Sequence, residues 1–159
     1  MDPSTYEIKR AYQTLGMLTP LKADCGKLCN AKCCQGNDSL GMYVLPGEME
    51  LLAKEPSYRF SGESFVVCCG TCHRHRRPLS CRIFPFMPVY KNEKLLLVID
   101  PRARFLCPIA SKEASVFWDQ EFLIALYQIF HRFLNVPELK NSILKLTETY
   151  DSYLKFFKK

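Results

Sequence analysis

The stretch Cys25-Gly26-Lys27-Leu28-Cys29-Asn30-Ala31-Lys32-Cys33-Cys34 carries four thiols within ten residues. Side-chain packing does not require that density, whereas thiolates at short, regular spacing let one turn of chain wrap a soft or borderline metal ion. The spacing C-x3-C-x3-C-C matches neither a zinc ribbon built on C-x2-C pairs nor a bacterial ferredoxin run. The stretch therefore predicts a metal site and leaves zinc and an iron–sulfur cluster both open.

A second group of cysteines follows an apolar, β-branched run. Residues Ser64–Cys69 predict a strand that ends in a loop, and Cys69-x2-Cys72 is a good chelating pair because two intervening residues let both sulfurs reach one ion. Adjacent strand residues point to opposite faces, so we expect Cys68 to be the odd cysteine, buried in the core. We also expect the two groups to meet in space. The full set of expected metal ligands is Cys25, Cys29, Cys33, Cys34, Cys69, Cys72, Cys81 and Cys107.

The first stretch, followed much later by Arg77-Pro78-Leu79-Ser80-Cys81-Arg82-Ile83-Phe84-Pro85, resembles the YkgJ-type cysteine-cluster family, which is described as a zinc- or iron-chelating domain. The commonest pattern of that family has tighter C-x2-C-x2-C-C spacing, so this chain resembles a divergent member. The likeness spans roughly Cys25 to Cys107. It implies ligand roles for Cys25, Cys29, Cys33, Cys34, Cys72 and Cys81, whereas Cys69 and Cys107 are expected from spacing alone.

The length of 159 residues predicts one domain, 1–159, in which residues 25–107 bear the metal and residues 111–157 form a helical hairpin. Nine cysteines cannot all pair within one molecule. The N-terminus has no basic and then apolar leader, so we expect a reducing cytoplasm, where thiols bind metal rather than form disulfides. No apolar run reaches the length of a membrane span, so no membrane partner is expected.

A basic loop lies beside the second cysteine group. Its members are His73, Arg74, His75, Arg76, Arg77 and Arg82. Arginine lowers the pKa of neighbouring thiolates and offsets their negative charge, which is the role we expect for this loop. The alternative is a patch for anions or nucleic acid, but the chain has no recognisable groove-entering motif, so nucleic acid is not an expected partner. The two histidines are expected near the metal rather than on it.

The remaining pattern predicts an α+β fold: a small irregular cysteine-rich metal-binding core with a short β-hairpin and two C-terminal antiparallel helices. Ser4 and Glu7 form a capping box for the first helix, and Gly, Asn and Asp predict turns over residues 35–41. The expected elements are a helix over Thr5–Leu15, a strand over Met42–Leu45, a short helix over Pro46–Lys54, a hairpin of Phe84–Tyr90 with Lys94–Ile99, and helices over Ser111–Leu134 and from Asn135 to Phe157.

Signatures of common enzyme classes, such as a P-loop, H-E-x-x-H and G-x-S-x-G, are missing, and whether the chain is an enzyme is left open. The expected function is zinc binding through the clustered cysteines. One alternative is an iron–sulfur protein with a redox or electron-delivery role. Another is an interaction module whose protein partner binds the C-terminal helices.

Overall fold

The computed structural model describes residues 1–35, 41–70 and 72–158 and has a mixed α/β fold, 53% helix and 15% strand. The turns predicted within residues 36–40 lie outside the described residues. The helices are α1 (Pro3–Leu15), α2 (Gly26–Cys29), α3 (Met49–Leu52), α4 (Leu79–Ile83), α5 (Gln120–Phe133) and α6 (Pro137–Phe157). The strands are β1 (Gly41–Tyr43), β2 (Tyr58–Ser61), β3 (Phe65–Cys68), β4 (Phe86–Lys91) and β5 (Lys94–Ile99). Short 3-10 turns are η1 (Lys32–Cys34), η2 (Arg74–Arg76), η3 (Pro101–Phe105), η4 (Pro108–Ala110) and η5 (Glu113–Phe117).

The predicted hairpin is confirmed, with β4 antiparallel to β5 from Phe86↔Ile99 to Lys91↔Lys94. Its turn residues Asn92 and Glu93 have φ values of 48° and 59°. Positive φ at both positions gives the twist that matches two right-twisted strands, so the register follows from the turn. A separate three-stranded antiparallel sheet has the order β1-β3-β2, with β3 in the centre.

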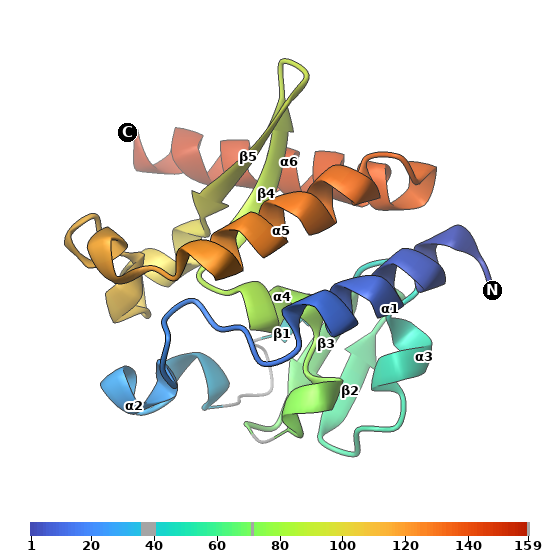
Figure 1. Ribbon diagram of the computed structural model, residues 1–159, viewed down its shortest axis with the longest axis horizontal. Helices are drawn as coiled ribbons and strands as arrows, with labels where there is room; N and C mark the ends of the chain where they lie inside the picture. The colour runs from blue at the N-terminus through green and yellow to red at the C-terminus, as the bar shows by residue number, and fades with distance from the viewer. Residues whose placement is uncertain (36–40, 71, 159) are drawn as a thin grey trace.

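The two C-terminal helices pack on opposite sides of the hairpin rather than along one another as expected. Figure 1 shows β4 and β5 between α5 and α6; α5 packs against α1 and β5, and α6 against β4. The physical reason lies in β4, where four consecutive residues from Phe86 to Val89 are buried. A strand buried on both faces needs a cover on both, and each helix supplies one.

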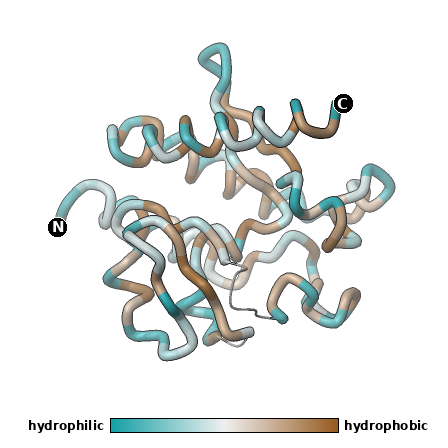
Figure 2. Tube along the Cα trace, turned by 180° about the vertical axis from the view of Figure 1, so that it is seen from behind, coloured by the Kyte–Doolittle hydropathy of each residue, from teal (hydrophilic) through white to brown (hydrophobic). Residues whose placement is uncertain are grey.

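Helix α6 is amphipathic and covers one side of the hairpin. Figure 2 shows hydrophilic and hydrophobic residues alternating along it. The backbone N–H of Tyr90 donates to Thr147 Oγ1 at 3.0 Å, and Lys91 pairs with Asp151. The helix therefore satisfies part of the edge of β4 as well as its apolar face. No helix among the described residues is long and apolar enough to cross a bilayer.

Two helices, α1 and α5, were expected to be capped by a serine, and in the structure an aspartate caps each of them. The carboxylate of Asp2, not the hydroxyl of Ser4, caps α1 by accepting the Thr5 N–H at 3.0 Å, and Ser4 is buried inside the helix. Asp119 caps α5 by accepting the Glu121 N–H at 3.1 Å. The region expected to form the first turns of that helix contains the 3-10 turn η5, and α5 begins only at Gln120, so the prediction from Ser111 was wrong at its start.

The main core joins both parts of the chain. Its buried residues include Ile8 and Leu15 of α1, Leu79 and Ile83 of α4, Phe86 and Leu95 of the hairpin, Phe122, Leu126, Ile129, Phe130 and Phe133 of α5, and Leu139 and Ile143 of α6. The hairpin thus belongs to the same core as the helices that follow residue 111. A smaller cluster of Val44, Leu52, Tyr58 and Val66 underlies the three-stranded sheet, and Cys68 and Cys72 pack against it.

One fully buried carboxylate, that of Glu48, ties three segments together. It accepts hydrogen bonds from the Tyr12 hydroxyl at 2.8 Å, from the Leu45 N–H at 2.8 Å and from the Leu79 N–H at 2.7 Å. Burial raises the pKa of Glu48, and the three donors act in the opposite direction. Leu79 is the first residue of α4, so the carboxylate also satisfies a free N–H at the start of that helix.

We expect Glu48→Ala to lower the free energy of unfolding by about 3 kcal/mol, because it leaves several buried donors without an acceptor. Urea denaturation of the purified protein measures the change. The control is Glu50→Gln on the exposed face of α3, which should stay within about 0.5 kcal/mol of the wild type. Equal stability of the two variants would show that the Glu48 contacts do not hold the fold.

Candidate metal centre

The first cysteine stretch forms a loop that turns back on itself without a core of its own. One helical turn, α2, is followed by Asn30 and Ala31 in the left-handed region at φ 53° and 51°, and then by η1. Left-handed backbone at an alanine is uncommon and persists only where its surroundings impose it. Between residues 21 and 35 no side chain is buried. Figure 1 shows α2 at the edge of the molecule.

The second cysteine segment lies directly against this loop. Strand β3 ends at Cys68, and Gly70 follows with φ 102°, a conformation that favours glycine. A Cβ on Gly70 would lie 2.9 Å from the Gln35 carbonyl oxygen and 3.1 Å from that of Cys34. The two cysteine segments, far apart in sequence, are therefore in backbone contact at Gly70.

One set of neighbouring thiols consists of Cys25, Cys29, Cys33 and Cys107. Burial raises the pKa of Cys25, and the thiols of Cys107 and Cys29 raise it further. Burial likewise raises the pKa of Cys107, with Cys29 acting in the same direction. Cys107 is carried to the first stretch by the turns after the hairpin, η3 and η4. We refer to these four cysteines as set one.

A second set consists of Cys34, Cys68, Cys72 and Cys81. Burial raises the pKa of Cys81, and the other three thiols raise it further. Burial also raises the pKa of Cys68, next to Cys72 and Cys34, and the Gly70 N–H lies 3.4 Å from its sulfur. We refer to these four cysteines as set two.

Cys69 was expected among the metal ligands and Cys68 in the core. In the structure, Cys68 rather than Cys69 neighbours the other thiols of set two. Cys68 is half-buried at the edge of the smaller cluster, whereas Cys69 is exposed and its N–H donates to the Ser57 carbonyl at 3.1 Å. The reason is the register of β3: Cys68 pairs with Tyr58 and shares the side of the sheet on which Cys72 packs.

Cys33 and Cys34 join the two sets, with their sulfurs 3.9 Å apart. The hydrogen bond between them lowers the pKa of Cys34 to about 6 and raises the pKa of Cys33. Arg77 also lowers the pKa of Cys34. Burial alone would lower the pKa of Arg77, but its hydrogen bond with Cys72 and the charges of Cys34 and Cys81 raise it. An arginine thus lies among the thiols of set two, as the basic loop predicted.

All nine cysteines are free thiols, and each is half-buried or exposed. Cysteine is among the residues most often fully buried, so nine that are not buried do not fit a purely structural use of the side chain. The thiols are neighbours without converging: in residues 1–35, 41–70 and 72–158, no group of three or more His, Cys, Asp or Glu side chains is arranged to hold a metal ion.

A carboxylate–histidine pair that was not predicted lies beside Cys72. Glu55, only 4% exposed, accepts hydrogen bonds from the backbone N–H of His73 at 3.2 Å and from the Ser57 hydroxyl at 3.1 Å. His73 Nδ1 lies 3.0 Å from the same carboxylate, and this hydrogen bond lowers the pKa of Glu55 to about 2. The His75 ring is next to that of His73.

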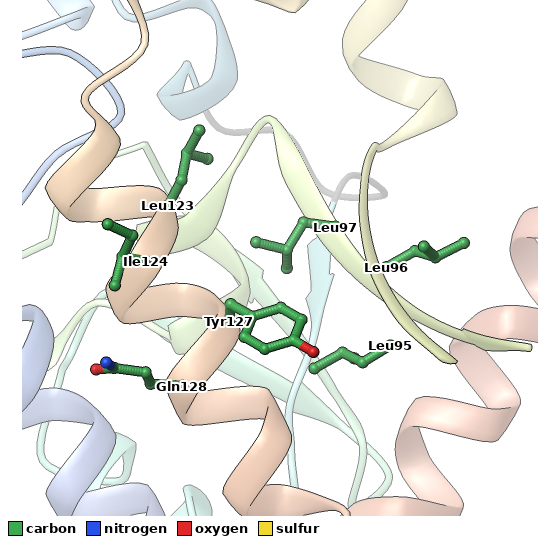
Figure 3. Close-up of a pocket in the computed structure, with 7 residues that line it drawn as sticks. All are labelled: Leu95, Leu96, Leu97, Leu123, Ile124, Tyr127 and Gln128. Atoms are coloured by element: carbon green, nitrogen blue, oxygen red, sulfur yellow. The ribbon is translucent and has the colours of Figure 1, made fainter. Parts of the chain in front are cut away.

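A shallow apolar pocket of about 590 Å³ lies elsewhere, between α5 and β5. Figure 3 shows its lining, Leu95, Leu96, Leu97, Leu123, Ile124, Tyr127 and Gln128. No carboxylate, imidazole or thiol is among these residues, and the phenol of Tyr127 is the one titratable group in the lining. It lies on a C-terminal helix, where the sequence predicts a protein partner, and that partner stays a prediction.

Comparisons with protein families, with curated proteins and with solved structures return no match for this chain.

We expect Gly70→Ala to disturb the junction between the two cysteine segments, because the added methyl group would meet the carbonyl oxygens of Cys34 and Gln35. Gly62→Ala is the matched control, since Gly62 also has a positive φ of 64° but has no atom within 4 Å of an added Cβ. Thermal unfolding should show a larger loss for Gly70→Ala, by about 1–3 kcal/mol. Equal losses would mean that only backbone strain matters and that the contact is loose.

Proposed function

We propose that this chain is a metal-binding protein that holds zinc through eight cysteine thiolates, four in set one and four in set two. The observation that carries the proposal is the loop of residues 21–35, which carries four thiols and has no buried side chain. A segment that lacks a core needs another source of free energy to keep its shape, and metal binding is such a source. The resemblance of both cysteine motifs to the YkgJ-type family supports the same proposal.

The donor set fits a borderline or soft ion. Thiolates suit Zn²⁺ and iron–sulfur clusters, and four of them satisfy a tetrahedral zinc ion. Four thiolates on Zn²⁺ leave two negative charges, and Arg77 offsets one of them in set two. Each set takes sulfurs from distant parts of the sequence, so binding would fasten the first stretch to Cys107 in one case and to the segment after β3 in the other.

The separation of the thiols before binding is consistent with this proposal. Zn–S bonds are about 2.3 Å long, so the sulfurs must move inward to share an ion. The loop can make that movement cheaply, because its backbone hydrogen bonds are local, such as Ala31 N–H to the Gly26 carbonyl at 2.8 Å.

Anaerobically purified protein should be colourless and contain close to two zinc ions per chain by elemental analysis. Cys29→Ala should remove one zinc and leave the other, because Cys29 belongs to set one alone. Broad visible absorption bands with stoichiometric iron would instead show that the cofactor is an iron–sulfur cluster. That result would favour the alternative of a redox or electron-delivery role. Protein that holds neither metal when its thiols are reduced would overturn the proposal.

The fourth ligand of set two can be identified by a matched pair of substitutions. Cys68→Ala should reduce the zinc content from two to one, while Cys69→Ala should keep two, because Cys68 is the cysteine that neighbours Cys72 and Cys81. The reverse result would restore the spacing-based expectation for Cys69. Circular dichroism of both variants verifies that the helices are intact.

Removal of the metal should loosen the cysteine segments selectively. In hydrogen exchange, chelation should reduce protection in residues 21–35, 68–70 and 72–77, while α1, α5, α6 and β4–β5 stay protected because they share the main core. We therefore expect the hairpin to keep its protection from hydrogen exchange, although it lies between Cys81 and Cys107 in the sequence. Unchanged protection in the cysteine segments after verified metal loss would instead favour a reactive or redox role for the thiols.

A further inference from the structure

The imidazoles of His73 and His75 form an exposed pair next to set two. Both residues are exposed, and their ring centroids lie 5.6 Å apart with an angle of 43° between the planes. Two imidazoles that share one ion at Zn–N distances of ~2.1 Å have centroids about 5 Å apart. Because the His73 ring is hydrogen-bonded to Glu55, the exposed His75 side chain would have to rotate to reach that arrangement.

The pair is oriented by a buried carboxylate. Glu55 is held in place by hydrogen bonds from the Ser57 hydroxyl and the His73 backbone N–H, and it lies 3.0 Å from His73 Nδ1. A carboxylate only accepts hydrogen bonds, so Nδ1 carries the proton and the lone pair of Nε2 faces away from Glu55. A carboxylate behind the second ring nitrogen is the usual support of a metal-binding histidine.

The turn that carries both histidines is fixed to the rest of the protein. Arg76 donates to the Lys54 carbonyl at 2.7 Å, and the Tyr58 hydroxyl donates to the Arg76 carbonyl at 3.1 Å. Arg74 donates to the Leu18 carbonyl at 3.3 Å. These guanidinium groups are thus directed at backbone carbonyls, although their charges still weaken the attraction for a cation.

We propose that His73 and His75 bind one divalent first-row transition ion through their imidazole nitrogens, at an exposed site separate from the thiolate sets. Imidazole suits Zn²⁺ and Ni²⁺. Because no third His, Cys, Asp or Glu side chain completes the group in the described part of the chain, water fills the remaining positions and the site is weaker than a four-thiolate site. Glu55 is a positioning residue that sets the tautomer of His73. This inference does not depend on zinc binding by the cysteines.

The test starts from the reduced chain that carries only the zinc held by its thiols, titrates it with further Zn²⁺ and follows the imidazole nitrogens by NMR. The protein has three histidines, and His131 is the internal control. The signals of His73 and His75 should shift together and saturate at one added ion, while that of His131 stays unchanged. His75→Gln should abolish the response of His73, and His73→Gln that of His75. Glu55→Gln should weaken binding about 10- to 100-fold.

Cys72→Ser separates this site from the thiolates. The paired imidazole response should persist in that variant, and its loss would show that the histidines only report metal bound to set two. A response of His73 that survives His75→Gln would also overturn the proposal, as would an equal response of His131. An unchanged affinity in Glu55→Gln, with helicity retained, would contradict the positioning role. If the thiols bind no zinc but the paired histidine response is intact, the thiolate proposal is refuted and the histidine proposal stands.

Discussion

The hydrogen bonds of the buried Glu48 carboxylate are the interaction on which the arrangement of the site depends. Through Tyr12 they fix α1, and through Leu79 they fix α4, the helix that carries Cys81. Arg82 lies 4.2 Å above the Tyr12 ring and donates to the carbonyl of Arg77 at 3.0 Å. The chain of contacts therefore runs from the core to the basic loop, and the position of Cys81 in set two follows from it.

Much of the fold was predictable because its signals are local. The hairpin follows from two apolar runs that flank Lys91-Asn92-Glu93, and the amphipathic pattern after Pro137 predicts α6. The errors concern competition between local options: Asp2 and Asp119 cap better than Ser4 and Ser111 in these contexts, since their carboxylates accept the free N–H groups. The prediction that α5 and α6 pack along one another was wrong. Their separation follows from the burial of β4 on both faces, which the periodicity of the helices does not reveal.

The candidate site was predictable in composition but not in grouping. Spacing within the first stretch identifies four thiols, yet it cannot say that Cys107 joins Cys25 while Cys34 joins the other set, because that depends on the path of η3 and on the contact at Gly70. Cys68 was expected in the core and is half-buried at the edge of the smaller cluster, because its side of the sheet follows from pairing with Tyr58. Glu55 was not found at all, because nothing in its local sequence distinguishes it from a solvated glutamate.

The two candidate sites differ in how much of their geometry exists before an ion arrives. Four of the thiols belong to a loop with no buried side chain, so part of any binding free energy there must go into ordering the chain. The histidines belong to a turn fixed by Arg76, Tyr58 and Glu55, so their order is supplied by the fold. A preformed, exposed pair should therefore capture an ion faster than the thiols can converge on one, even though four thiolates hold it more tightly once they have closed. Since His73 follows Cys72 directly in the sequence, the proposed imidazole site adjoins the proposed site of set two.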